Sequence, residues 1–399
     1  MPLIAATQLL AWRRRLLAAA VAEGSQAAAL DWLLELGGGL SWRQRQELWL
    51  HPQRPVRLSR SLAELESLWQ RHRQTREPLQ YLVGLCPWRD LRLAVGPGVL
   101  IPRQETELLV DLALRLTPAA EAGEPLRWVD LGTGSGCLAL ALLRALPGSE
   151  GLAVDASRDA LRQAAANLAN LANLAASAAA PPPPGAITVG SLPPEPLPAE
   201  RSAEPQAAEP QPAEPPPSQG LSEQALPEQA PSGLPLPTQP PPPTQLLATQ
   251  RLSRQPPSAQ PPPPPTLPPR APASPSRLQI RQGDWWEPVR DRWGRLQLAV
   301  SNPPYIPSAE LGRLDPVVRD HEPWLALDGG QDGLEAIRRI IAGAPDALAP
   351  GGVLLLEHHH DQSEAVLALL NAAGLEAACA HRDLEGVARF VSARRPERS

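Results

Sequence analysis

Lysine is absent from this chain of 399 residues, so every one of its 37 lysine-or-arginine positions is an arginine. Methionine and phenylalanine occur once each, and tyrosine occurs twice. The formal net charge is −5, which leaves no overall basic field of the kind that binds nucleic acid regardless of sequence. We attribute the missing lysine to a coding bias toward arginine rather than to function.

Cysteine is also scarce, because Cys86, Cys137 and Cys379 are the only three and lie far apart. They offer neither zinc-site spacing nor a disulfide framework, so we expect a reducing, cytoplasmic location. No apolar run approaches about 18 residues, so no membrane span is predicted. The arginines at 13–15 before the apolar run at 16–22 faintly resemble a signal peptide, but the continuing helical pattern favours an amphipathic helix.

One long segment lacks aromatic residues altogether. Residues 178–277 contain no Phe, Trp or Tyr, and more than half of the 52 prolines lie between Pro181 and Pro275. Such a segment cannot bury enough apolar surface to offset the entropy lost on ordering. We therefore predict a disordered proline-rich insertion with polyproline II bias. The alternative is a docking tract for SH3-like or WW-like modules.

The rest of the chain, about 300 residues, is enough for a helical domain and an α/β domain. Residues 5–75 show helical spacing, with Ser41 and Ser61 as predicted N-caps. A hairpin is predicted at 88–101 and a helix at 105–116. Strands are predicted near 127–131, 151–155, 278–282, 296–301, 352–357, 375–380 and 388–393. Because helices alternate with them, the pattern predicts a mostly parallel, twisted α/β sheet.

The motif Asn302-Pro303-Pro304-Tyr305 directly follows an apolar run that is predicted to be a buried strand. The asparagine oxygen and a proline carbonyl can each accept one N–H of an NH2 group. The prolines fix φ and bring no donors, and the tyrosine face can stack on a planar group. We therefore predict that these four residues form a catalytic clamp for an amide or amino nitrogen. The alternative is a plain Pro-Pro turn.

A glycine-rich turn follows an earlier strand, and its residues are Gly132, Thr133, Gly134, Ser135 and Gly136. Glycine lets the backbone approach a ligand closely. The spacing fails the dinucleotide fingerprint G-x-G-x-x-G, and no P-loop pattern occurs. We expect the turn to bind a ligand with an amino acid part and a nucleoside. Asp130, just before it, is expected near the ligand's cationic amino group.

Two further strands end in acidic residues. Asp155 lies roughly 20 residues after the glycine-rich turn, the usual place for a carboxylate that binds ribose hydroxyls. Asp284 and Trp285 are predicted to flank an adenine. Taken singly, Asp155 also fits a helix N-cap and Trp285 a core aromatic. Ligands of parallel sheets bind beyond the carboxyl ends of the strands, so the ends at Gly132, Asp155 and Asn302 should converge.

Together these motifs resemble the S-adenosylmethionine-dependent N-methyltransferases with a seven-stranded Rossmann-like fold. Asn-Pro-Pro-Tyr is shared by glutamine-amide and adenine-N6 methyltransferases. The stretches 78–84 (PLQYLVG), 99–107 (VLIPRQETE), 322–334 and 351–357 are similar to the peptide chain release factor N5-glutamine methyltransferase family. The chain departs from that family at Gln104, where a proline is usual, and at His358, where a small residue is usual.

The resemblance implies methyl transfer from S-adenosylmethionine to the glutamine amide nitrogen in the Gly-Gly-Gln motif of release factors. It implies an N-terminal helical substrate-recognition domain (1–77), a linking hairpin (78–104) and a methyltransferase domain (105–177 and 278–399). The cofactor-binding residues would be Gly132, Thr133, Gly134, Ser135, Gly136, Asp155, Trp285 and Asn302. We expect a cytoplasmic monomer that acts in translation termination on release factors, with no direct nucleic-acid or membrane partner.

Several alternatives stay open. The first two are an adenine-N6 nucleic-acid methyltransferase and a ribosomal-protein glutamine methyltransferase; the third is a scaffold in which the proline-rich segment is the functional part. Arg103, with Glu105 and Glu107, fits either steering of the substrate peptide or a salt bridge between domains. Neighbouring strand residues point to opposite faces, so at most His358 and His360 could share a metal. No further ligand is evident, and we expect no metal.

The first testable prediction concerns the insertion. The cost of closing a loop grows only with the logarithm of its length, so the flanking core should fold as if the loop were short. Deleting residues 181–275 and bridging the ends with a short Gly-Ser linker should therefore retain methyltransferase activity. Circular dichroism and an activity assay check this, and loss of the folded signal would contradict it.

Overall fold

The computed structural model describes residues 2–20, 26–118, 124–177, 188–190 and 276–397. The prediction of disorder for residues 178–277 falls almost wholly outside these ranges. Among the described residues, no helix is long and apolar enough to cross a lipid bilayer.

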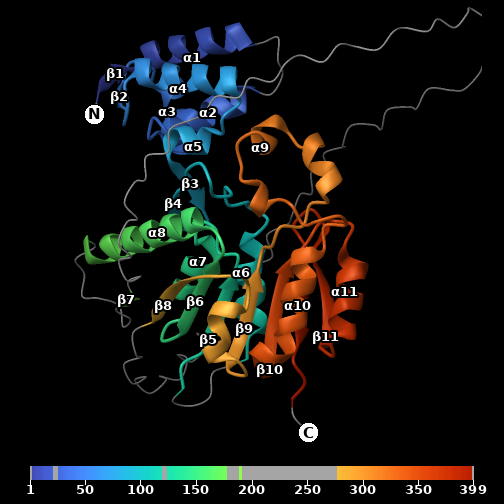
Figure 1. Cartoon of the computed structure of the whole chain (residues 1–399). Helices are drawn as coiled ribbons and strands as arrows, with labels where there is room; N and C mark the ends of the chain where they lie inside the picture. Colours follow the sequence, from blue (N-terminus) through green and yellow to red (C-terminus); the bar gives the residue numbers. More distant parts are fainter. Residues whose placement is uncertain (1, 21–25, 119–123, 178–187, 191–275, 398–399) are drawn as a thin grey trace, which may run out of the picture. The chain divides into compact units, whose positions relative to one another are not determined.

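The N-terminal part is helical and has a core of its own (Figure 1). Its core consists of leucines together with Ala6, Trp12 and Trp69. Ser41 and Ser61 begin their helices with complete capping boxes, as predicted. The helices are α1 (Ala6–Ala20), α2 (Gln26–Leu36), α3 (Trp42–Leu50), α4 (Leu62–Thr75) and α5 (Leu79–Val83). The helical pattern did not predict the short antiparallel pair β1 (Leu3–Ala5) and β2 (Pro55–Arg57).

The linking hairpin lies earlier than predicted. β3 (Leu85–Trp88) pairs with β4 (Leu91–Ala94), so the prediction of a hairpin at 88–101 is wrong. Arg89 has a φ of 50°, which fits a tight two-residue turn. Pro97 lacks the N–H that a paired strand donates, and residues 95–101 therefore form a loop.

The central sheet contains all seven predicted strands. They are β5 (Arg127–Leu131), β6 (Glu150–Asp155), β8 (Arg277–Gln282), β9 (Leu296–Ser301), β10 (Leu348–Glu357), β11 (Glu376–Arg382) and β12 (Ala388–Arg394). A short additional strand, β7 (Thr188–Gly190), pairs with β8 at one edge, inside the segment predicted to be disordered. The deletion proposed above would remove it.

The order of strands across the sheet is β11-β12-β10-β9-β5-β6-β8-β7. β12 runs antiparallel to both of its neighbours, and the other pairs are parallel. This is the mostly parallel, Rossmann-like α/β sheet that the sequence predicts.

Helices cover both faces of the sheet (Figure 1). One buried core contains residues of α6 (Glu107–Leu116), α7 (Cys137–Ala145) and α8 (Arg158–Ser177), and the other contains residues of α10 (Glu335–Ala347) and α11 (Ser363–Ala372). Successive strand residues alternate between the cores, so Trp128 packs in the first and Val129 in the second. Burial on both faces explains why the central strands, such as β9 and the second half of β10, are nearly continuous apolar runs.

The connection between β9 and α10, residues 302–334, is long and carries only short helices. These are η3 (Ser308–Arg313), α9 (Pro316–Arg319) and η4 (Trp324–Ala326), and η2 (Glu287–Arg292) precedes β9. Residues Pro323, Leu325, Ala326 and Asp328 of this connection line the main cavity of the described chain. The connection therefore belongs to the site as well as to the fold.

The packing of the sheet also explains why position 151 is a glycine. Gly151 lies opposite Trp128 in the β5–β6 pairing, and a Cβ at position 151 would overlap the Trp128 ring. Trp128 is fully buried, and its indole N–H donates to Ser149 Oγ at 2.9 Å. The flat ring thus occupies the space that a side chain would need.

The second prediction follows from this packing. Gly151→Ala should lower the free energy of unfolding by about 1–3 kcal/mol, because a packed core tolerates an added methyl group poorly. Gly312→Ala is the matched control, since a Cβ there meets nothing within 4 Å. Urea denaturation of both variants measures the difference, and equal stability would contradict the packing argument.

Candidate active site

Two turns meet at one edge of the sheet. β5 pairs in parallel with β6 on one side and with β9 on the other, so all three strands end at the same edge. Ser301 Oγ, at the end of β9, donates to the carbonyl of Leu131, at the end of β5, at 2.6 Å. A cavity of about 310 Å³ lies beyond these ends, as the sequence predicts.

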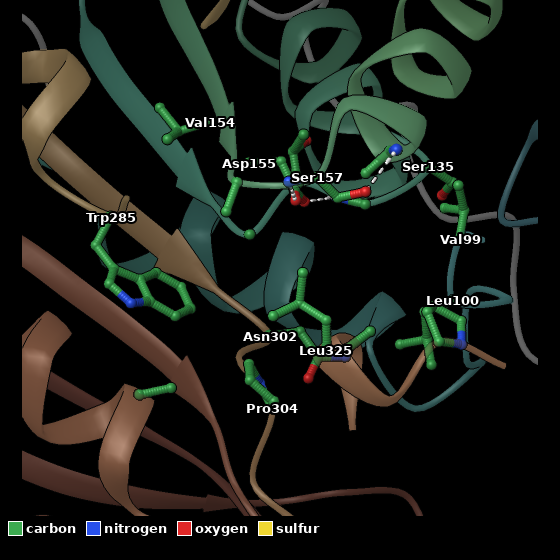
Figure 2. Close-up of a pocket in the computed structure, with 18 of the residues that line it drawn as sticks. Val99, Leu100, Ser135, Val154, Asp155, Ser157, Trp285, Asn302, Pro304 and Leu325 are labelled. Atoms are coloured by element: carbon green, nitrogen blue, oxygen red, sulfur yellow. Dashed lines mark hydrogen bonds between the residues drawn. The ribbon is translucent and has the colours of Figure 1, made fainter. Parts of the chain in front are cut away.

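Most of the predicted site residues line this cavity. They are Gly132, Thr133, Gly134, Ser135, Asp155, Trp285, Asn302 and Pro304. Figure 2 shows Asp155 and Ser157 on one side of the cavity and Asn302 with Pro304 across from them. Gly136, Pro303 and Tyr305, by contrast, are not among the lining residues.

The glycine-rich turn bends sharply between β5 and α7. Gly132 and Gly134 have φ values of 74° and 57°, a left-handed region that other residues rarely adopt. The N–H groups of Gly132 and Thr133 both donate to the carbonyl of Val154, at 2.9 Å. These bonds fix the turn to β6 and hold the backbone of the turn close to the cavity.

Asp155 holds the same turn from the end of β6. Its Oδ2 accepts from the Gly134 N–H and its Oδ1 from the Ser157 N–H, both at 2.8 Å. Burial raises the pKa of Asp155. Each oxygen keeps capacity for a further donor, as ribose hydroxyls would require. The capping bond at the start of α8 goes to Ser157, whose Oγ accepts from the Ala160 N–H, so Asp155 is free of that alternative role.

Asp130 lies fully buried beneath the turn. Its Oδ2 accepts from Thr133 Oγ1 at 2.7 Å and from the Ala139 N–H at 3.2 Å. Its Oδ1 has no hydrogen-bond partner among the described residues. Burial raises the pKa of Asp130 to about 7. Asp130 does not itself line the cavity, so its unpaired oxygen fits a contact through water with the cationic amino group of a cofactor.

Trp285 and Asp284 complete the cofactor side of the cavity. Trp285 has a φ of 44°, which is strained for so large a residue. Its ring faces the cavity (Figure 2), and a Cβ added to Gly132 would lie 3.4 Å from it. Asp284 forms an ion pair with Arg339, and both line the cavity. A flat apolar wall beside a charged pair suits an aromatic base.

Asn302 is hydrogen-bonded to Thr106, and Thr106 in turn to Glu357; neither of these two was predicted as a site residue. Asn302 Nδ2 donates to Thr106 Oγ1 at 3.0 Å, and Thr106 Oγ1 donates to Glu357 Oε2 at 2.8 Å. The hydroxyl of Tyr305 donates to Glu357 Oε1 at 3.1 Å. Tyr305 is thus anchored to Glu357 at the back of the site. Burial raises the pKa of Glu357 to about 7.

The sequence does contain features that could have indicated Thr106 and Glu357 as site residues. Glu357 ends a buried apolar strand, as Asp155 does, and Thr106 lies between Glu105 and Glu107. The missing information is the neighbour relation of β10 and β9, which brings Glu357 next to the Asn302 turn.

Arg103 lines the cavity and also pairs with Glu322 of the β9–α10 connection. Its Nη2 lies 2.8 Å from Oε1 of Glu322. Glu322 is almost fully buried, and its Oε2 accepts from the Ile101 N–H at 3.3 Å. Burial raises the pKa of Glu322, and Arg103 opposes that rise. Of the two roles considered for Arg103, these contacts favour a salt bridge that fixes the β9–α10 connection to the loop after β4.

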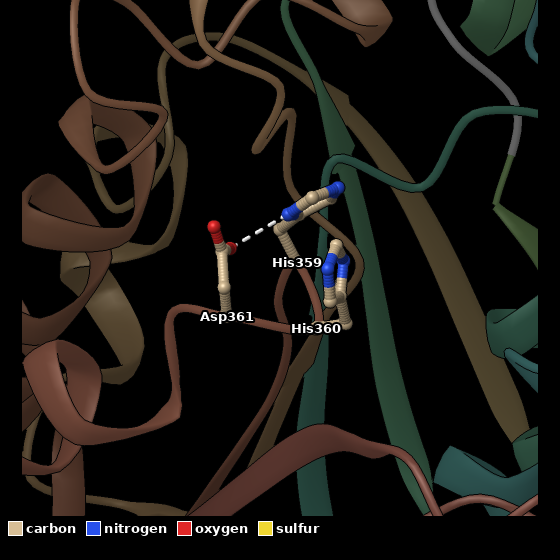
Figure 3. Close-up of side chains that lie close together, drawn as sticks. All are labelled: His359, His360 and Asp361. Carbon is tan, nitrogen blue, oxygen red and sulfur yellow. Dashed lines mark hydrogen bonds and ion pairs between the residues drawn. The ribbon is translucent and has the colours of Figure 1, made fainter. Parts of the chain in front are cut away.

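The histidine run lies on the loop after β10. His358, one of the two histidines that could at most have shared a metal, is buried, with its Nε2 3.2 Å from Ser363 Oγ. Instead His359, His360 and Asp361 lie together (Figure 3), and His359 Nδ1 is 2.7 Å from Asp361 Oδ1. The hydrogen bond between His359 and Asp361 accounts for this grouping, and we assign no metal to it.

Curated relatives match this chain over nearly its whole length. A release factor glutamine methyltransferase of Prochlorococcus marinus is 37% identical over 391 residues, covering 98% of this chain and 97% of the relative. Enzymes of the same name from Gloeobacter violaceus and Synechocystis are 34% and 31% identical, and cover 95% and 94% of this chain and 94% and 92% of their own lengths.

A solved structure of a release-factor-specific protein-(glutamine-N5) methyltransferase from Alicyclobacillus acidocaldarius is 21% identical. It matches 76% of this chain and 99% of its own, with a TM-score of 0.29. That likeness is too low to carry an argument. No family model matches the sequence. The identity and coverage of the curated relatives decide the assignment: this chain belongs to the release factor glutamine methyltransferase family.

Proposed function

We propose that this protein transfers the methyl group of S-adenosylmethionine to the side-chain amide nitrogen of the glutamine in the Gly-Gly-Gln motif of peptide chain release factors. The names of its relatives support the substrate class. The observation that carries the chemistry is the cavity itself, where Asn302 of the Asn-Pro-Pro-Tyr turn faces the glycine-rich turn and Asp155. The group that would accept the N–H bonds of the substrate amide and the site for the nucleoside thus lie in one cavity.

The cofactor is S-adenosylmethionine, which when bound supplies an electrophilic methyl group on a sulfonium. In this proposal the glycine-rich turn accommodates its amino acid part, with Asp130 near the ammonium group. Asp155 accepts hydrogen bonds from the ribose hydroxyls, and Trp285 packs against the adenine. The unpaired Oδ1 of Asp130 and the cavity-facing Trp285 ring support this arrangement.

The Asn302 side chain and the Pro303 carbonyl bind the reacting nitrogen. An amide nitrogen is a weak nucleophile because its lone pair is delocalised into the carbonyl. Asn302 Oδ1 accepts one N–H, and the carbonyl of Pro303, a residue that does not itself line the cavity, is the proposed acceptor for the other. The two bonds increase the electron density on nitrogen and fix the amide plane. Pro304 lines the wall beside them, and Tyr305 supports the turn through Glu357.

Most of the acceleration of methyl transfer then comes from the positions of the two reacting atoms. The turn has to hold the nitrogen about 3–3.5 Å from the methyl carbon and in line with the sulfur. Acceptors matched to the positive charge that develops on nitrogen lower the barrier further. As the nitrogen–carbon bond forms, the amide proton becomes acidic and leaves to water, so no strong general base is needed.

We further propose that the enzyme works as a monomer in the cytoplasm, on protein and not on nucleic acid. The three cysteines are unpaired, and Cys86 and Cys137 are buried, which is compatible with a reducing compartment. The net charge of −5 argues against a duplex-binding enzyme. Analytical ultracentrifugation tests the oligomeric state.

The third prediction tests the reaction directly. Labelled methyl should pass from S-adenosylmethionine to purified release factor, and mass spectrometry should locate it on the Gly-Gly-Gln glutamine. A release factor with that glutamine replaced is the control and should remain unlabelled. Labelling of adenine in DNA or RNA, or of ribosomal protein alone, would contradict the proposal.

The fourth prediction compares the two halves of the cavity. Asn302→Ala should lower kcat by about 10²–10³-fold, because it removes an acceptor needed in the transition state. Its affinity for S-adenosylmethionine should stay within a few-fold of the wild type. Asp155→Ala should instead weaken cofactor binding by about 10–100-fold, the value of hydrogen bonds to a charged group.

Calorimetry of cofactor binding and steady-state kinetics separate these effects. The controls are Asn371→Ala, at an exposed position of α11, and Asp291→Asn in the ion pair with Arg281, both away from the cavity. Full activity in Asn302→Ala would disprove its role, and unchanged cofactor affinity in Asp155→Ala would disprove the ribose contact.

A further inference from the structure

Four side chains form a continuous hydrogen-bonded chain that begins at the cavity wall, where Asn302 and Thr106 lie, and ends behind it. Asn302 follows β9, Thr106 precedes α6, Glu357 ends β10, and Tyr305 belongs to the connection after β9. Their three bonds run from Asn302 Nδ2 to Thr106 Oγ1, from Thr106 Oγ1 to Glu357 Oε2, and from Tyr305 to Glu357 Oε1. Thr106 and Glu357 are each only 2% exposed, so water does not compete for these bonds.

The direction of each bond is determined by chemistry. In its ionised form Glu357 can only accept hydrogen bonds, so the Thr106 and Tyr305 hydroxyls both donate to it. The single proton of Thr106 is thereby used, and Thr106 can only accept from Asn302. Asn302 must therefore turn its NH2 group toward Thr106, which leaves its oxygen available to the cavity.

We propose that Thr106 and Glu357 are positioning residues, which select the orientation of the Asn302 amide that presents oxygen, not NH2, to the reacting nitrogen. The inference rests on the proposed function, because only a substrate NH2 group requires an acceptor there. A reversed Asn302 would direct its own N–H groups at those of the substrate and could not bind it.

The burial of Glu357 supports a role beyond packing. Among the described residues, Glu357 makes no ion pair, and its hydrogen-bond partners are two hydroxyl groups. Removing a carboxylate from water without a cation partner is costly. An apolar residue would fill this position at lower cost, so the carboxylate is better explained by the donors that it orients than by stability.

The first test exchanges the Thr106 hydroxyl for a methyl group. Thr106→Val should lower kcat about tenfold, the value of one orienting hydrogen bond, with S-adenosylmethionine affinity unchanged. Thr106→Ser keeps the hydroxyl and should recover most of that loss. Thr117→Val at the other end of α6, where the hydroxyl only bonds the Ala113 carbonyl, is the matched control and should keep wild-type kcat.

The second test uses a double mutant. In Glu357→Met the Thr106 hydroxyl loses its acceptor and can donate to Asn302 Oδ1, which turns the amide the wrong way. Adding Thr106→Val removes that misdirected donor. The double variant should therefore be at least as active as Glu357→Met alone, whereas a role in packing alone makes the two losses add.

The outcomes separate this inference from the function on which it rests. Wild-type kcat in Thr106→Val, equal losses in the Val and Ser variants, or additive losses in the double variant would each overturn the positioning role. A parallel loss of cofactor affinity and melting temperature in Thr106→Val would do the same. If the wild-type enzyme does not methylate release factor, the proposed function fails before any variant is compared.

Discussion

The parallel pairing of β9 with both β5 and β10 is the constraint on which the site depends. The register places Val300 opposite Asp130 and Ser301 opposite Leu356, so the three strands end along one line. A slip of one residue would turn every side chain of a strand to the other face. Asn302 would then no longer meet Thr106, and the glycine-rich turn would no longer face the Asn-Pro-Pro-Tyr turn. Burial of both sheet faces enforces the register, because a slip would exchange side chains between two differently packed cores, as at Gly151, which leaves room for the Trp128 ring.

Much of the fold could be predicted because its signals are local. A strand buried on both faces is a nearly continuous apolar run, as in β9 and β10, and all seven predicted strands are present. The N-caps Ser41 and Ser61 could be predicted because each capping box involves only the serine and the residue three positions later. The hairpin was misplaced because its turn at Arg89 has no glycine or asparagine to mark it. The pair β1–β2 joins segments about fifty residues apart, and no local pattern announces such a pairing.

The site was predictable in its parts but not in its connections. The glycine-rich turn, Asp155 and Asn302 were predicted from sequence, and the strand order brings them together. Thr106 and Glu357 escaped notice because their significance lies in bonds between residues 251 positions apart. Tyr305 was expected against the substrate, whereas its hydroxyl is committed to Glu357. The preference for glutamine over adenine came from resemblance and relatives, since a cavity that accepts an NH2 group does not by itself distinguish the two.

The buried carboxyl groups of Asp130 and Glu357 lower the stability of the fold. Both are fully buried at strand ends, and burial raises the pKa of each to about 7, from usual values of 3.8 and 4.5. Between those usual values and about pH 7, the folded state keeps protons that the unfolded chain releases. Stability therefore falls as the pH rises through this window. Above it the fold carries two buried, ionised carboxylates, and the charge of Arg389 only partly offsets the cost of burying Glu357. Only the ionised forms, however, offer every oxygen as an acceptor. The proposed roles of Asp130 and Glu357 both require the ionised form, which is thus the form that the fold tolerates least. This is the expected relation when residues are kept for chemistry rather than for stability.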